Sequence, residues 1–194
     1  MVAPLSMRRW LPAKRAAEGL FGSPGAAAQI FFLVIGLPWG LLLAVLFPPF
    51  AITDEPAHFN RAYALASGQL GVIQRAQGAF VLLPPSLGRL ETRLGDAVRG
   101  HPESTLRPRT IVAALGEPLG AHELEFVDVR TAAQFSFVPY LPQAAGIACG
   151  RLFGATPLLL FYCARLSNLL VSSVLIGLAI GQIPTRSGSW PWRR

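Results

Sequence analysis

The chain has 194 residues, of which 52% are apolar and 14% charged, and its mean hydropathy is +0.45. These values exceed what a soluble domain of this length usually shows, so the composition favours a protein whose partner is a lipid bilayer. The formal net charge is +7, but the arginines are scattered and form no basic stripe with interleaved aromatic residues, which argues against nucleic-acid binding. Cys149 and Cys163 lie inside apolar stretches without the spacing of a zinc site.

Residues 29–50 are predicted to form a first transmembrane helix. The segment from Ile30 to Phe47 carries no charge and, with its apolar flanks, is long enough to cross about 30 Å of hydrocarbon. The four basic residues of the 1–28 segment outnumber its one acid, so the positive-inside rule places this N-terminus in the cytoplasm. A cleaved signal peptide is the competing interpretation, but no A-x-A site follows the apolar run.

A second transmembrane helix is predicted for residues 157–182. Leu158 to Gly181 is apolar and long enough to cross, and a single charge, Arg165, interrupts it. A charge about two turns inside a span is costly. We therefore expect the Arg165 side chain either to snorkel to the nearer interface or to face a wet protein interior.

Residues 135–153 are apolar but carry prolines near their start and Arg151 near their end. They are predicted to form a short transmembrane or re-entrant helix that begins near Pro142, because proline is tolerated in the first turn of a helix but not in its middle. If this helix crosses the membrane, the polar tail of residues 183–194 lies outside. If it does not, the tail stays inside, as the charge rule favours.

Between the spans, residues 51–134 are predicted to form a long extracytoplasmic loop. They hold nine of the ten acids and all three histidines, with proline and glycine throughout, a pattern typical of short helices and irregular connections packed on the membrane face. The expected fold is an all-α membrane protein, multi-pass in the plasma membrane, with two to three transmembrane helices. Its long extracytoplasmic loop should contain short juxtamembrane helices.

The most informative part of the loop runs from Thr53 to Gly68 and reads TDEPAHFNRAYALASG. An acid at the N-cap, a proline in the first turn and a glycine stop predict a helix of about three turns just outside the first span. Asp54 and Glu55 precede His58 by four and three residues, so these side chains can converge on one face. Carboxylates at a helix N-terminus stay ionised, which suits a metal ligand, a base or the partner of a cation. An ordinary helix opening explains the same residues.

Two stretches carry a resemblance to a known family. They are FPPFAITDEPAHFNRAYALASGQL, directly after the first span, and SFVPYLPQAAGIACGRLFG followed by LLLFYCARLSNLL. Together they are similar to the N-terminal part of the bacterial predicted membrane proteins grouped as domain of unknown function family 2142, which resembles the C-fold glycosyltransferases. Members of that grouping continue through further membrane helices, and the resemblance favours the alternative in which residues 135–153 cross the membrane. The resemblance therefore implies a truncated, N-terminal fragment of a polytopic protein of cell-envelope glycan synthesis.

The resemblance implies an enzyme that uses a lipid-phosphate sugar donor, such as a polyprenyl-phosphate sugar. Asp54 and Glu55 are then the candidate catalytic carboxylates. Asp54 is expected to contribute more, as the base that activates an acceptor or as the ligand of a divalent cation. The candidate substrate-binding residues are His58, Arg61, Tyr140 and Arg165. The alternative is a non-enzymatic membrane protein whose extracytoplasmic loop packs or binds a partner.

Overall fold

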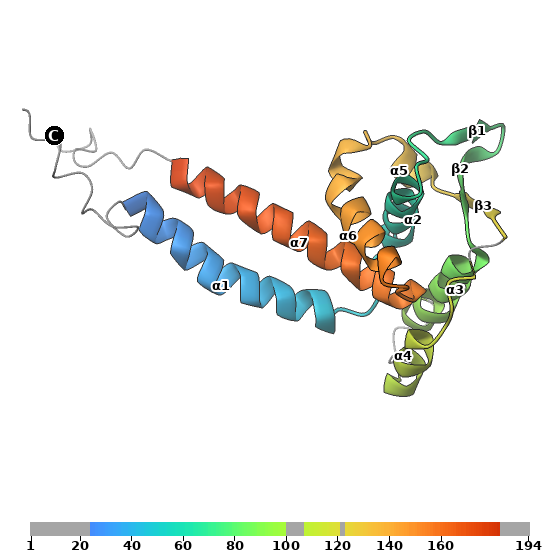
Figure 1. Ribbon diagram of the computed structural model, residues 1–194, viewed down its shortest axis with the longest axis horizontal. Coiled ribbons are helices and arrows are strands. Elements are labelled where there is room, and N and C mark those ends of the chain that lie inside the picture. The colour runs from blue at the N-terminus through green and yellow to red at the C-terminus, as the bar shows by residue number, and fades with distance from the viewer. Residues whose placement is uncertain (1–23, 100–106, 121–122, 183–194) are drawn as a thin grey trace, which may run out of the picture.

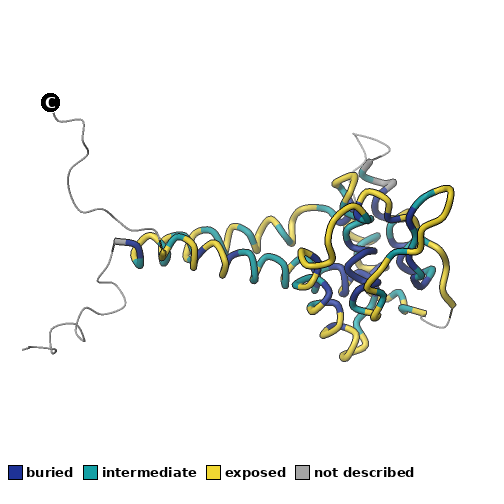
Figure 2. Tube along the Cα trace, turned by 90° about the horizontal axis from the view of Figure 1, so that it is seen from above, coloured by how far each residue is buried: buried dark blue, intermediate teal, exposed yellow. Residues whose placement is uncertain are grey.

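A computed structural model describes residues 24–99, 107–120 and 123–182 (Figure 1). Two long helices form a stalk, and the elements between them in the sequence form a body at one end of that stalk (Figures 1 and 2). Most of the predicted N-terminal segment and the whole polar tail of residues 183–194 fall outside the described residues.

The stalk consists of α1 (Pro24–Leu46) and α7 (Pro157–Gln182), which run antiparallel along each other (Figure 1). Within the described ranges, these are the two helices that are long and apolar enough to cross a membrane. Both helices are exposed along much of their length (Figure 2), and their exposed residues include many large apolar ones. Exposed apolar surface of this extent is typical of helices that face lipid. The structure thus supplies the two predicted candidate spans.

The first two turns of α7 belong to the body rather than to the stalk. Leu158, Leu160 and Phe161 are buried there, where α7 packs against α6, α3 and α4. Leu169 lies against Gly40 of α1, and Leu33 lies against Gly177. The part of α7 that runs beside α1 therefore starts near Arg165 and is about 26 Å long at 1.5 Å per residue.

Helix α6 (Leu141–Leu152) follows the short 3-10 helix η2 (Val138–Tyr140) and packs antiparallel against the start of α7. The Ser167 hydroxyl donates to the Pro142 carbonyl at 2.5 Å. The helix begins beside Pro142, as predicted, but its 12 residues span only about 18 Å. A helix needs about 30 Å to cross the hydrocarbon core, so α6 by itself is shorter than a full span.

A three-stranded antiparallel sheet corrects the all-α prediction. It consists of β1 (Ile73–Arg75), β2 (Gly78–Leu83) and β3 (Glu125–Asp128) in the order β1-β2-β3. Alternate residues of β2 are buried, as expected for a strand with one face on a core. Phe80 pairs with Asp128, so the sheet depends on a contact between distant parts of the sequence.

The body is organised around α2 (Glu55–Ala66), which lies against α6 and the sheet. The C-cap of α2 is Ser67, and Gly68 follows it with a φ of +86°, the left-handed conformation that commonly terminates helices. The apolar face of α2 is buried in the protein core and not on lipid, since Phe59, Ala62 and Tyr63 are nearly inaccessible. Three further helices complete the body: α3 (Pro85–Arg99), α4 (Pro108–Leu115) and α5 (Arg130–Ala133).

Candidate functional site

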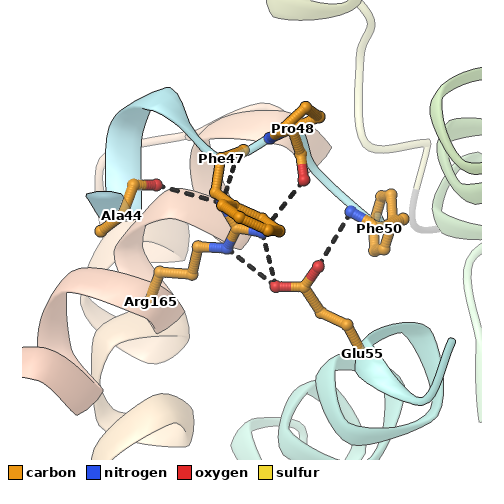
Figure 3. A network of polar contacts seen from close by, with 6 residues as sticks. All are labelled: Ala44, Phe47, Pro48, Phe50, Glu55 and Arg165. Atoms are coloured by element: carbon orange, nitrogen blue, oxygen red, sulfur yellow. Dashed lines mark hydrogen bonds and ion pairs between the residues drawn. The ribbon is translucent and has the colours of Figure 1, made fainter. Parts of the chain in front are cut away.

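The candidate site is built around Arg165, where the stalk meets the body. Its guanidinium reaches the C-terminal end of α1, where the last carbonyls lack partners within the helix (Figure 3). Nη1 donates to the carbonyl oxygens of Ala44 and Phe47 at 3.1 and 2.8 Å, and Nη2 donates to that of Pro48 at 3.3 Å. A cation at this position also complements the negative end of the α1 dipole.

Glu55, the first residue of α2, is the counter-ion of Arg165. Nε and Nη2 donate to its Oε1 at 2.8 and 2.6 Å, and the Arg165 and Glu55 side chains are only 14% and 18% exposed. The five N–H groups of the guanidinium are thus all used, because Nη1 and Nη2 each have two acceptors and Nε has one. Arg165 therefore joins α1, α2 and α7, and it keeps no N–H free for a substrate phosphate.

The second oxygen of Glu55 holds the turn between α1 and α2. The Phe50 N–H donates to Oε2 at 3.0 Å, and Phe50 has a φ of +60°, which is unfavourable for a bulky side chain (Figure 3). Its ring is fully buried, with its centroid 6.1 Å from that of Phe59 and 4.6 Å from that of Phe161. Both oxygens of Glu55 thus serve the framework of the site.

A cavity of about 490 Å³ opens beside this ion pair, between α1, α2, α6 and α7, and we call it the interfacial cavity. Its lining is mostly apolar, but polar and charged side chains occur together on the wall toward the body, which we call the polar wall: Glu55, His58, Gln143, Arg165 and Asn168. Its part between the two candidate spans is mostly apolar and includes Gly40, Leu43, Leu169 and Ser172. A cavity with one polar wall and one apolar crevice suits an amphiphilic molecule.

His58 is held on the polar wall by Tyr140. The Nδ1 atom of His58 lies 2.8 Å from the Tyr140 hydroxyl oxygen, and that hydroxyl donates to the Ala132 carbonyl at 3.3 Å. Burial raises the pKa of the Tyr140 hydroxyl above its ordinary value, against the lowering effect of the Arg61 charge, so this group stays protonated at neutral pH. With the tyrosine proton directed at Ala132, the His58 proton lies on Nδ1 and Nε2 is an acceptor; a tyrosine proton directed at Nδ1 would reverse the two nitrogens.

Gln143 and Asn168 join the interfacial cavity to a smaller one of about 270 Å³, because both residues and His58 line the two cavities. The smaller cavity also touches Phe135 and Tyr140. Neither amide side chain has a hydrogen-bond partner in the part of the chain that the structure describes. Two amides without partners at one junction leave donors and acceptors available for a ligand.

Asp54 occupies a different environment from Glu55. It is exposed, it is not among the residues that line the interfacial cavity, and its side chain does not cap α2. Ile52 and Glu55, which flank it closely in the sequence, both line the cavity. Of the two candidate carboxylates, Glu55 thus lies on the cavity wall and Asp54 lies outside the lining.

The side chains of Arg61 and Tyr140 are both bonded to other parts of the protein. Arg61 is buried, and its guanidinium donates to the carbonyl oxygens of Gln69 and Leu70 at 3.1 and 2.6 Å. It therefore secures the chain after α2 and does not line either cavity. Tyr140 borders the smaller cavity and orients His58.

The divalent cation considered for Asp54 does not fit the residues present. Within the described ranges, no three side chains of His, Cys, Asp or Glu come together as a metal site would require. The nearest carboxylate in sequence, Glu55, is already bonded to Arg165 and Phe50. No chemical step through a metal follows from this arrangement.

A family model described as "Predicted membrane protein (DUF2142)" matches residues 37–191, well over half of the chain. The chain belongs to this family. Comparison with curated proteins and with solved structures gave no match. Membership in DUF2142 agrees with the two apolar helices and confirms the family that the motifs indicated.

The two free amides are candidate site residues of this DUF2142 chain that sequence reasoning did not single out. Gln143 follows the tyrosine and proline of the sequence YLPQ, and Asn168 ends the sequence ARLSN. Both belong to the stretches that carry the family resemblance, which was the available signal. Their role could not be read from sequence because it depends on the antiparallel pairing of α6 with α7.

Proposed function

We propose that this chain contributes the lipid-facing substrate site of a glycosyltransferase-like membrane enzyme. The supporting observation is the interfacial cavity, which joins a polar wall to an apolar crevice between two candidate spans. A lipid-linked sugar has the same division, with a polar head and an apolar chain. In this proposal the head group contacts His58, Gln143 and Asn168, and the lipid chain enters between α1 and α7.

Asp54 is the proposed base for transfer. Asp54 directly precedes the lining residue Glu55, and its side chain makes no cap hydrogen bond, whereas Glu55 is held by Arg165. The carboxylate takes the proton of an acceptor hydroxyl while the hydroxyl oxygen bonds to the anomeric carbon of the donor sugar. The bond from that carbon to the phosphate oxygen breaks, and the polyprenyl phosphate leaves as an anion.

The proposed location is the bacterial plasma membrane, with the N-terminus in the cytoplasm and the body outside. The N-terminal end of α1 and the C-terminal end of α7 lie together at the end of the stalk away from the body (Figure 1). The basic residues of the N-terminal segment favour the cytoplasm for that end. Lipid-linked substrates would then reach the cavity from the outer leaflet.

The test is sugar transfer in membranes that carry the chain. A polyprenyl-phosphate hexose labelled in the sugar is supplied, and the label should move into a second lipid-soluble product. Asp54→Asn should lower this transfer at least a hundredfold without changing the amount of inserted chain, because the amide keeps the shape but loses the charge. Glu123→Gln, an exposed acid elsewhere in the body, is the matched control.

Wild-type transfer in the Asp54→Asn variant would exclude Asp54 as the base. No transfer above that of membranes without the chain would contradict the transferase proposal.

A second candidate function, a non-enzymatic membrane protein, then gains support from the ion pair itself. Glu55 and Arg165 satisfy each other and the end of α1, as residues with a purely structural role do.

A further inference from the structure

We infer that the interfacial cavity binds an uncharged, hydroxyl-bearing head group on an apolar chain, that is, a glycolipid acceptor, and not the phosphate of a donor. This inference rests on the proposed function and names the substrate class of the same site. It follows from the charges and hydrogen-bonding groups on the cavity wall.

The first argument is that the described wall offers no free cation. All five N–H groups of Arg165 are bonded to Glu55 and to the carbonyls at the end of α1. The other arginine of the candidate site, Arg61, does not line the cavity and donates to two backbone carbonyls. A phosphate placed here would bring negative charge into a half-enclosed site beside Glu55, and it would have to break existing bonds of Arg165.

The second argument is that the free polar groups of the wall are neutral and bind in both directions. Gln143 and Asn168 each offer an amide N–H₂ and a carbonyl oxygen, and neither group has a partner within the described chain. His58 presents Nε2 once its Nδ1 is bonded to Tyr140. A sugar hydroxyl both donates and accepts, so two or three neighbouring hydroxyls match this set.

The third argument is the position of the apolar crevice. Gly40, Leu43 and Leu169 line the part of the cavity that runs between α1 and α7. A Cβ atom at Gly40 would lie 2.7 Å from Cδ1 of Leu169, so the glycine permits the close approach that forms this wall. An acyl or isoprenoid chain attached to the bound sugar would pass along these side chains into the bilayer.

Direct binding measurements test this inference without requiring transfer. The full chain is placed in lipid nanodiscs free of glycosidic detergent and titrated with decyl β-glucoside, decyl phosphate and decanol, with empty nanodiscs as the background. The glucoside should bind at least tenfold more tightly than either of the other probes. Gln143→Leu and Asn168→Leu should each weaken glucoside binding about fivefold, the loss of one hydrogen bond worth about 1 kcal/mol.

The matched control is Gln74→Leu, which removes an exposed amide on β1 and should leave glucoside binding unchanged. Decyl phosphate or decanol binding as tightly as the glucoside would overturn the inference, as would full glucoside affinity in both cavity variants. Preference for the phosphate would leave the proposed transferase function intact, because the donor would then occupy the cavity. Selective glucoside binding without sugar transfer would instead refute the proposed function. The inference that the interfacial cavity binds a glycolipid head group would then still hold.

Discussion

Glu55 and Arg165 lie 110 residues apart in the sequence, yet the Arg165 Nη2 and Glu55 Oε1 atoms are 2.6 Å apart. This contact explains how a charge can occur inside an otherwise apolar helix. Arg165 lies level with the end of α1, in the protein interior at the base of the body, and not in the hydrocarbon-facing part of α7. Arg165 was expected either to snorkel to the membrane interface or to face a wet protein interior, and the structure supports the protein interior.

Removing this ion pair should destabilise the chain. Glu55→Gln leaves the half-buried Arg165 charge without its counter-ion, and we expect a loss of about 2 kcal/mol in the free energy of unfolding. The apparent melting temperature in detergent should fall by about 5 °C. Asp54→Asn, which changes the neighbouring exposed acid, is the control and should shift the apparent melting temperature by less than about 2 °C. Equal melting temperatures for wild type and Glu55→Gln would show that the pair adds no stability.

Tyr140→Phe should release His58. The variant removes the hydroxyl that accepts from Nδ1, at a cost of about 1 kcal/mol, and lets the imidazole exchange between its two tautomers. Nitrogen-15 spectra of the histidine rings should show one tautomer for His58 in the wild type and a mixture in the variant. Tyr162→Phe, on α7, should leave the His58 signals unchanged. A wild-type His58 already in the Nε2–H form would contradict the assigned direction of the hydrogen bonds.

Gly146→Ala should disturb the pairing of α6 with α7. A Cβ atom there would overlap the Cys163 carbonyl oxygen and lie 2.7 Å from the Ser167 Cβ, and we expect a cost of about 2 kcal/mol from the displaced helix. The cost should appear as a lower apparent melting temperature. Gly71→Ala serves as the control, because nothing lies within 4 Å of a Cβ at Gly71. Equal stability of the two variants would mean that α6 is packed less closely against α7 than the structure indicates.

The orientation of the chain can be tested by labelling. In a background without Cys149 and Cys163, a cysteine placed at the exposed Gly71 should react with a membrane-impermeant maleimide added to intact cells. We expect labelling from outside because the basic N-terminal segment should hold the end of the stalk away from the body in the cytoplasm. A cysteine that labels only after cell lysis, in chains shown to be inserted, would invert the proposed orientation.

The sequence predicted local features well, because they depend on neighbouring residues. The uncharged run from Ile30 to Phe47 identified α1, and the proline and glycine at either end of α2 identified its extent. The start of α6 beside Pro142 followed from the same rule for proline. Each of these signals lies within the element that it predicts.

Features that depend on distant contacts were not predicted. The pairing of β2 with β3 was missed because more than forty residues of chain separate the two strands. The hairpin of β1 and β2 is local, but its two-residue connection, Ala76 and Gln77, lacks the asparagine or glycine that signals a hairpin turn. The contact of Glu55 with Arg165 could not be predicted either, because the two residues come from helices far apart in the sequence. The role of Gln143 and Asn168 required the pairing of α6 with α7.

The most direct test of the account is to fill the apolar crevice of the interfacial cavity. Ser172→Phe places a ring in the cavity from α7, whereas Val174→Phe places the same ring two residues further along, at an exposed position that does not line the cavity. Binding of decyl β-glucoside in nanodiscs is measured for both. We predict at least a tenfold loss of affinity for Ser172→Phe and no change for Val174→Phe. Equal affinity in the two variants would contradict the assignment of this cavity as the lipid-substrate site.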